Sequence, residues 1–290
     1  MHSVDPASST RGAVYRDLLA QLRAGDIASA ELDARLLIGA AAGVDDIALI
    51  ADPDKLIAGE ALAVLDAFVQ RRLAGEPVSR ILGTREFWGL SFVLNGQTLD
   101  PRPDSETLIE SVLHHVRDKE ASLNLLDLGT GTGCLLLALL SELPNARGHG
   151  VDCASDAIEA ATVNGDQLGL ASRATFSLGD WGEGLAGPFD LVISNPPYIP
   201  SADIETLSPE VRLHDPMKAL DGGGDGLNAY RAIALETARL LTPTGSAFWE
   251  FGIGQLKDVS LIAQSAGLEV LGVDPDLAGI PRILKVRRRK

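Results

Sequence analysis

An apolar segment, a glycine-rich turn and a second apolar segment follow one another in the middle of the chain. Residues 123–128 are typical of a buried strand, and residues 134–140 are typical of an apolar helix. Between them stand Gly129-Thr130-Gly131-Thr132-Gly133. Glycines let a ligand approach the backbone closely, so this order indicates a nucleotide-binding α/β fold. The Gly-x-Gly-x-Gly spacing and the absence of a following Lys-Ser/Thr argue against a pyrophosphate ligand, and a plain tight turn is the alternative for this loop alone.

Two further polar positions follow short apolar segments downstream. Asp152 ends residues 149–152, nineteen residues after the last glycine of the turn, and a carboxylate at about this spacing suits the hydroxyls of a ribose. Trp181, preceded by an aspartate, follows the strand-like residues 174–178. A large ring beside a polar group can hold the face and the edge of an adenine. The expected ligand is therefore an adenosine that carries no pyrophosphate.

The tetrapeptide Asn195-Pro196-Pro197-Tyr198 follows a third apolar segment, residues 189–194. A proline has no N–H for a strand ladder, so the strand ends there and Asn195 is pushed toward an extended conformation. Open α/β sheets place their ligands at the carboxyl ends of strands. The side-chain amide, the prolyl carbonyls and the aromatic ring can hold a planar amine or amide by its two N–H groups. Taken alone, the same string is also typical of a turn.

Together these segments resemble S-adenosylmethionine-dependent methyltransferases, and more narrowly the peptide-chain release factor glutamine methyltransferases. The resemblance extends from about residue 75 to the end. It includes residues 83–87, 101–106, 219–223, 225–227 and 250–252, and Gln255. The chain departs from the family's usual pattern at Asp215, where Glu is usual, at Ser105, where Thr is usual, and at residues 79–82.

The resemblance implies transfer of a methyl group from S-adenosylmethionine to the side-chain N5 of the glutamine in the Gly-Gly-Gln motif of class I release factors. Asn195 and the Pro196 carbonyl would accept the two amide N–H bonds, and Tyr198 would pack over the amide plane. Pro197 completes the expected substrate-binding residues. The expected cofactor-binding residues are Gly129, Thr130, Gly131, Thr132, Gly133, Asp152, Trp181 and Asn195. Glu106 and Glu250 are weaker candidates, for which a solvated charge is the alternative.

The implied fold is an α/β class I methyltransferase (Rossmann-like) sheet with a small N-terminal helical bundle joined by a β-hairpin. The sheet would close with antiparallel strands near the C-terminus. We expect a helical substrate-recognition domain over residues 1–76, a hairpin linker over residues 77–100 and an S-adenosylmethionine-binding catalytic domain over residues 101–290. A glycine-rich run at residues 222–226 indicates a long loop after the tetrapeptide, either a lid or a disordered connection.

Apolar residues at helical spacing predict the helices of the bundle. They cover residues 14–24, 29–43 and 61–73. Ser29 is expected to cap the second helix, whose apolar side would carry Leu32, Leu36 and Leu37.

A net charge of −15 weighs against nucleic-acid partners. Phosphate contacts need clustered Lys and Arg, and the one basic cluster is the terminal segment 287–290, typical of a solvated tail. We expect no stable nucleic-acid binding. An adenine N6-methyltransferase acting on DNA or rRNA stays the alternative, because an exocyclic amine offers the same two N–H groups. A non-catalytic adenosine-binding module and a dinucleotide oxidoreductase are the alternatives from other classes.

The remaining composition indicates a cytoplasmic protein. No apolar run approaches the roughly 18 residues of a membrane span, and the first residues lack a basic segment followed by an apolar one. Cys134 and Cys153 are the two cysteines of the chain, and neither has a second Cys or His at ligand spacing. Reduced thiols and no bound metal are the expectation.

Overall fold

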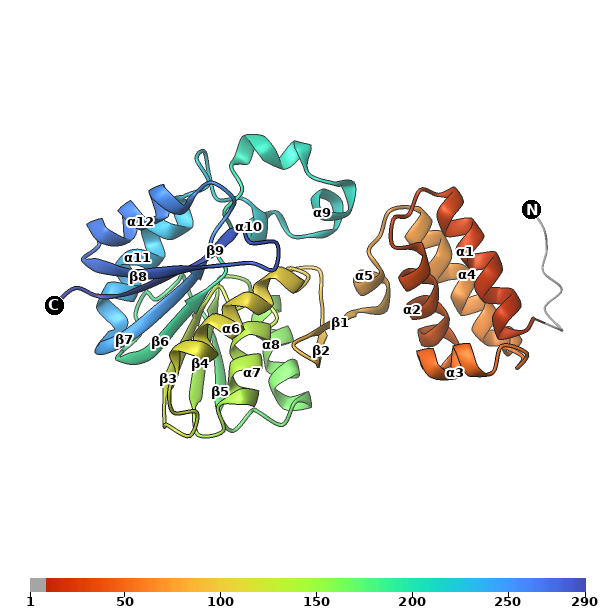
Figure 1. Ribbon diagram of the computed structural model, residues 1–290, viewed down its shortest axis with the longest axis horizontal. Helices are drawn as coiled ribbons and strands as arrows, with labels where there is room; N and C mark the ends of the chain where they lie inside the picture. Colours follow the sequence, from red (N-terminus) through yellow and green to blue (C-terminus); the bar gives the residue numbers. More distant parts are fainter. Residues whose placement is uncertain (1–8) are drawn as a thin grey trace. The chain divides into compact units, whose positions relative to one another are not determined.

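The computed structural model describes residues 9–290, which form two compact units with their boundary between Gly83 and Thr84. The first unit is helical (Figure 1). Its helices are α1 (Arg11–Ala24), α2 (Ala30–Ala42), α3 (Asp46–Ala51), α4 (Gly59–Leu73) and α5 (Val78–Leu82). Their buried side chains form one core, which includes Leu18, Leu22, Leu37, Ile38, Leu65 and Val69. The sequence pattern has no signal for α3 and α5, which span only one or two turns.

Two expectations about α2 are wrong. Ser29 stands at the N-cap, but within the described chain its side chain caps no backbone N–H, because its backbone lies outside the extended region that this bond needs. Leu32 and Leu36 are exposed. The buried stripe runs instead through Ala34, Leu37 and Ile38, which are three and four residues apart and therefore share one side of the helix.

An ion pair inside this unit joins α2 to α4. Arg72 Nε donates to Asp33 Oδ2 at 2.7 Å, and both side chains are at least nine-tenths buried. Removing one partner of a buried pair leaves the other charge without compensation, which is far more costly than losing an exposed pair.

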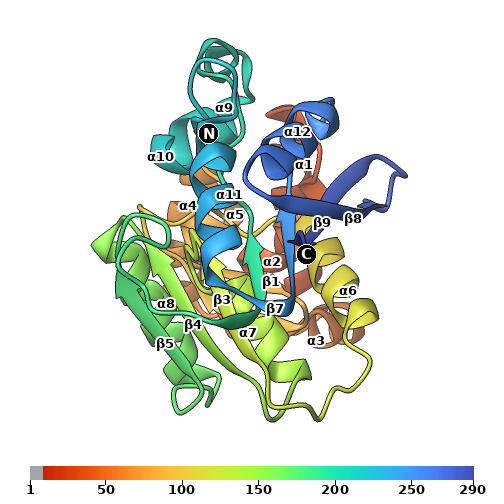
Figure 2. The same ribbon diagram turned by 90° about the vertical axis from the view of Figure 1, so that its left-hand side faces the viewer.

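The second unit is a seven-stranded sheet with helices on both faces, preceded by a two-stranded hairpin (Figures 1 and 2). The hairpin pairs β1 (Thr84–Phe87) with β2 (Leu90–Val93). The sheet has the order β5-β4-β3-β6-β7-β9-β8. Its strands are β3 (Asn124–Leu128), β4 (Arg147–Asp152), β5 (Ala174–Leu178), β6 (Phe189–Ser194), β7 (Leu241–Glu250), β8 (Leu268–Pro275) and β9 (Pro281–Arg288). The first five in spatial order are parallel, and β9 and β8 close the sheet in antiparallel fashion, as expected.

Alternate residues of the strands enter two different cores. Leu125, Leu191 and Phe248 belong to the core covered by α6 (Glu106–His115) and α7 (Cys134–Glu142). Their sequence neighbours Leu126, Val192 and Trp249 belong to the core covered by α11 (Asn228–Leu240) and α12 (Leu256–Ser265). α8 (Ser155–Gln167) packs against β4 and β5. Successive side chains of a strand point to opposite faces of the sheet, and here both faces are covered by apolar cores. The strands therefore appear as continuous apolar runs in the sequence.

The segment after the tetrapeptide is not the long loop that the sequence predicts. It contains the 3₁₀ helix η2 (Ser201–Thr206) and the short helices α9 (Pro209–His214) and α10 (Met217–Leu220). Its glycine-rich end is bonded to the chain near the tetrapeptide, since Gly222 N donates to Ile199 O and Ser201 N donates to Gly223 O. Helices of four to six residues leave too little periodicity to be recognised in sequence.

Two further observations complete the fold. A second 3₁₀ helix, η1 (Pro103–Ser105), leads directly into α6. No helix within residues 9–290 is long and apolar enough to cross a membrane.

The buried ion pair generates a stability prediction. Asp33→Ala should lower the free energy of unfolding by about 3–5 kcal/mol, because the buried Arg72 guanidinium would lose its ion pair with Asp33. Glu31→Ala on the same helix is the matched control: Glu31 pairs with Arg23 at the surface, and its loss should lower the free energy of unfolding far less. Urea unfolding of the full chain, followed by circular dichroism, measures both. Equal losses in the two variants would contradict the role of the buried pair.

Candidate active site

The carboxyl ends of β3, β4 and β6 open into one pocket of the second unit. Its lining residues include Gly129, Thr130, Gly131, Thr132, Asp152, Asp180, Trp181, Asn195 and Pro197. Most residues that the sequence predicts for an adenosine ligand therefore lie together. Gly133 does not line this pocket. It stands at the start of α7, and a Cβ there would lie 3.2 Å from Ala161 and Leu137, so its small size serves helix packing.

The glycine loop is held by hydrogen bonds from two of its inner residues, Thr130 and Gly131. Gly129 and Gly131 have positive φ values of 75° and 55°, which L side chains rarely adopt. Thr130 Oγ1 donates to Asp127 Oδ2 at 2.7 Å, and Gly131 N donates to Asp152 Oδ2 at 2.9 Å. Asp152 thus shapes the loop and also faces the pocket, where its oxygens have further lone pairs for a ligand's hydroxyls.

Asp127 is a buried carboxyl beneath this loop, and the sequence pattern indicates it only as part of a strand. Burial raises its pKa to about 7, against the lowering effect of the Thr130 hydrogen bond. Its Oδ1 atom has no hydrogen-bond partner within the described residues. The sequence signal that could have indicated a role for Asp127 is a charged residue inside an apolar strand.

Trp181 closes one side of the pocket. This residue has a positive φ of 49°, and a Cβ built on Gly129 would lie 3.3 Å from the Trp181 Cζ3 atom. The indole therefore lies against the glycine loop, and a side chain in place of Gly129 would crowd the ring. This arrangement provides an apolar wall for a planar ligand.

A buried asparagine of α8, Asn164, joins the hairpin to the glycine loop. Its side chain is fully buried. Its Oδ1 atom accepts from Val93 N at 2.7 Å, and its Nδ2 atom donates to Thr132 O at 2.9 Å. One side chain therefore ties these two segments together, and no sequence pattern indicates it.

The tetrapeptide lies between this pocket and a second one. Asn195 lines both pockets, Pro197 lines the first, and Pro196 and Tyr198 line the second. The second pocket is mainly apolar and is completed by residues of the segment after the tetrapeptide, namely Leu207, Val211, Ala219 and Leu220. Asn195 therefore lies at the border of the two pockets, where it can contact a ligand in either one.

The side chain of Asn195 is held by residues far away in sequence. Asn195 Nδ2 donates to Ser105 Oγ at 3.0 Å, and Ser105 Oγ donates to Glu250 Oε2 at 2.6 Å. Glu250 ends β7 and is buried, so the solvated-charge alternative is wrong for it. Burial raises the pKa of Glu250 to about 7, while the Ser105 hydrogen bond lowers it. In the sequence, Ser105 stands out only as a departure from the family pattern.

Glu106 has a different place from Glu250. Its Oε1 accepts from Trp88 N at 2.8 Å, which ties the hairpin to the first turn of α6. Glu106 lines neither of the two pockets. Asp215, the other departure from the family pattern, pairs with Arg102, which lines both pockets.

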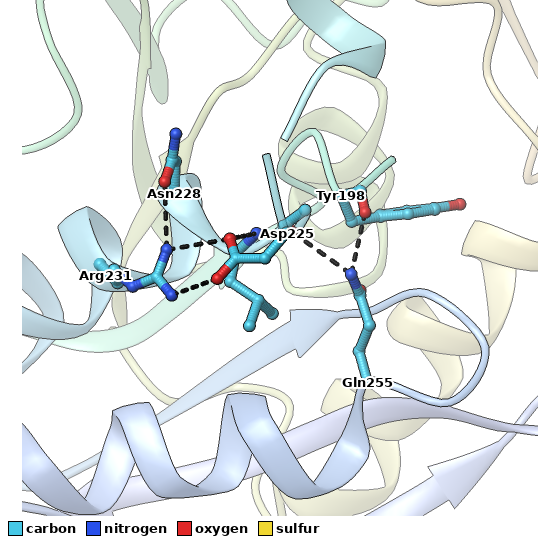
Figure 3. A network of polar contacts seen from close by, with 7 residues as sticks. Tyr198, Asp225, Asn228, Arg231 and Gln255 are labelled. Carbon is cyan, nitrogen blue, oxygen red and sulfur yellow. Dashed lines mark hydrogen bonds and ion pairs between the residues drawn. The ribbon is translucent and has the colours of Figure 1, made fainter. Parts of the chain in front are cut away.

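Gln255 fixes the far end of the tetrapeptide (Figure 3). Its Nε2 donates to Tyr198 O at 2.9 Å and to Gly226 O at 3.3 Å, and its Oε1 accepts from Gly252 N at 3.0 Å. A Cβ at Gly226 would lie 2.4 Å from Tyr198 O, so the chain needs glycine there to close around Tyr198. Burial raises the pKa of Tyr198 to about 12, and its hydroxyl therefore stays neutral at physiological pH.

An ion pair supports the glycine-rich turn next to Gln255. Arg231 Nη2 donates to Asp225 Oδ2 at 2.5 Å, and Arg231 Nη1 also donates to Asn228 Oδ1 at 3.1 Å (Figure 3). Asp225 Oδ1 accepts from Leu227 N at 3.2 Å. The turn that carries Gly226 is thus held by Asp225 and Arg231 and by the bond from Gln255 to Gly226 O.

Comparisons with known proteins agree with this geometry. Residues 13–83 match the PrmC N-terminal domain, and residues 119–247 match a methyltransferase domain. A release factor glutamine methyltransferase of Bradyrhizobium diazoefficiens is 48% identical over 94% of this chain and 93% of its own length. One of Rhodospirillum rubrum is 46% identical over 93% of this chain and 82% of its own.

A solved structure supports the fold alone. A methyltransferase from Pyrococcus furiosus is 16% identical, with a TM-score of 0.52 over 78% of this chain and 98% of its own. The identity and coverage of the two sequence relatives are high enough to show the family. The chain belongs to the release factor glutamine methyltransferase family.

Proposed function

We propose that this protein transfers a methyl group from S-adenosylmethionine to the side-chain N5 of the glutamine in the Gly-Gly-Gln motif of class I release factors. The observation that carries the proposal is the place of Asn195, which lines both pockets at the carboxyl end of β6. The two sequence relatives named above support the same reaction.

The first pocket fits an adenosine ligand. Gly129 and Gly131 leave the backbone open, Asp152 offers carboxylate lone pairs, and the Trp181 ring offers an apolar face. These residues, with Thr130, Thr132 and Asn195, would hold S-adenosylmethionine. When bound, that molecule supplies a methyl group on a positively charged sulfur.

The second pocket suits the glutamine side chain. Asn195 Oδ1 and the Pro196 carbonyl would each accept one N–H of the amide, and Tyr198 would cover its plane. An amide nitrogen is a weak nucleophile because its lone pair is delocalised, so orientation at close range is the main contribution that the site can make. Asn195 and Pro196 would hold the amide nitrogen toward the methyl group that S-adenosylmethionine would supply. The nitrogen would gain the methyl carbon, the electron pair of the broken carbon–sulfur bond would stay on sulfur, and the proton lost from the nitrogen would pass to water.

The helical unit is proposed to recognise the protein substrate. Residues 1–76 would carry this role, residues 77–100 would link, and residues 101–290 would bind cofactor and catalyse. Exposed apolar side chains of the unit, among them Ile47 and Ile50, support a protein contact. A cytoplasmic location fits a substrate that acts in translation termination.

Cofactor choice gives the first prediction for this site. Calorimetry should show binding of S-adenosylmethionine and no binding of NAD. Asp152→Ala should weaken the binding by about 1–3 kcal/mol, because the ligand's hydroxyls and Gly131 N lose their acceptor. Glu159→Ala, an exposed charge removal on the adjoining α8, is the control and should leave affinity unchanged. Tight binding of NAD would contradict the assignment of S-adenosylmethionine as the cofactor.

The target class gives a second prediction. With labelled S-adenosylmethionine, the label should enter a class I release factor and should not enter duplex DNA or ribosomal RNA. The reason is the net charge of −15, which repels phosphate backbones. Gel separation of the labelled products measures this. Efficient adenine methylation would favour the nucleic-acid alternative instead.

Asn195 gives the third prediction. Asn195→Ala should lower turnover by roughly 10²-fold or more and leave cofactor affinity within a few-fold, since orientation contacts of this kind contribute about 3 kcal/mol. Asn195→Asp keeps an acceptor oxygen and the size, so it should retain more activity than the alanine variant. Intact-mass analysis of the release factor measures the rates. Wild-type turnover in Asn195→Ala would show that the tetrapeptide is only a turn.

A further inference from the structure

Ser105 connects Glu250 to Asn195 beneath the tetrapeptide. Ser105 ends η1, Glu250 ends β7, and Asn195 directly follows the last residue of β6. Ser105 and Glu250 are each 3% exposed. The Oγ atom of Ser105 is 2.6 Å from Glu250 Oε2 and 3.0 Å from Asn195 Nδ2. The role proposed above for Asn195 uses only its oxygen, so the contacts of its nitrogen serve a different purpose.

The chemistry of the three groups fixes the direction of both hydrogen bonds. An ionised carboxylate can only accept, so Ser105 must give its single proton to Glu250. The remaining lone pairs of the hydroxyl can only accept, so Asn195 must turn its NH₂ group toward Ser105. The amide oxygen of Asn195 then points away from Ser105, and it is this oxygen that a substrate amide needs.

We propose that Glu250 and Ser105 are positioning residues that fix the side-chain amide of Asn195 with its oxygen available to the substrate glutamine. The inference rests on the proposed function, because it assigns a use to that oxygen. Neither residue needs to touch the reacting atoms.

Protonation of Glu250 would reverse the chain of hydrogen bonds. A neutral carboxyl can donate to Ser105, whose own proton then becomes free to bond the oxygen of Asn195 and favour the flipped amide. Burial raises the pKa of Glu250 to about 7, so the reversal falls within an accessible pH range. Both protonation states are therefore open to measurement in the folded protein.

Other groups also act on the pKa of Glu250. Arg282 of β9 and the Asn195 side chain lower it, and Asp104 of η1 raises it. The charge of Glu250 in turn raises the pKa of Tyr198, Tyr230 and Cys134. Burial raises the pKa of each of these three far above neutrality, so none of them titrates with Glu250. The orientation of Asn195 should therefore follow Glu250 as the pH falls from about 8 to about 6.

Kinetics with the release factor test the proposal. Ser105→Ala should lower kcat by about 10-fold or more with KM within a few-fold, because orientation and not binding is lost. Ser105→Thr keeps the hydroxyl and is the matched control, so it should retain most of the wild-type kcat. In the wild type, kcat should fall as the pH drops below about 7. Glu250→Gln cannot titrate, so it should keep only the part of this fall that comes from Asp127, whose pKa is also raised to about 7.

A measurement without cofactor separates this inference from the proposed function. In ¹⁵N-labelled protein, the side-chain NH₂ signals of Asn195, assigned by their loss in Asn195→Ala, should shift with a midpoint near pH 7. They should not do so in Glu250→Gln. The same shift in Glu250→Gln, or wild-type kcat in Ser105→Ala, would overturn the positioning role. A wild type that never methylates glutamine but shows the shift would overturn only the proposed function.

Discussion

The parallel pairing of β3 with both β4 and β6 is the constraint on which the rest of the second unit depends. Leu128 pairs with Val151, and Asp127 pairs with Ile193, so the three strands end at nearly the same level. The residues just beyond them therefore meet at one edge of the sheet. Two apolar cores hold the strands from either face, which leaves the polar chemistry to the turns at that edge.

Long apolar runs made the sheet predictable from sequence. Residues 174–178 and 189–194 were expected as strands and are β5 and β6. The glycine loop, Asp152, Trp181 and the tetrapeptide follow such strands, so the edge of the sheet brings them together. Strand ends are marked by glycine and proline, whose backbone effects are local and can be recognised without knowledge of the fold.

The parts that sequence did not reveal depend on tertiary contacts or on very short elements. Ser105 and Glu250 are 145 residues apart, and nothing local indicates that their side chains meet. Helices α9 and α10 are too short to show a period. Leu32 and Leu36 are as apolar as core residues, yet the first unit buries the neighbouring stripe. Gly133 was expected in the ligand loop, but helix packing explains it.

The buried carboxyl groups at the sheet edge make the folded state sensitive to proton concentration. Glu250 and Asp127 have pKa values raised to about 7 from ordinary values of 4.5 and 3.8. A raised pKa means that their contribution to stability is fully present in acid and is lost as the pH rises through about 7, on the order of 3 kcal/mol for each group. The edge of the sheet that holds the candidate active site therefore lowers the free energy of unfolding at neutral pH. A ligand that binds to the folded state at this edge would raise it again.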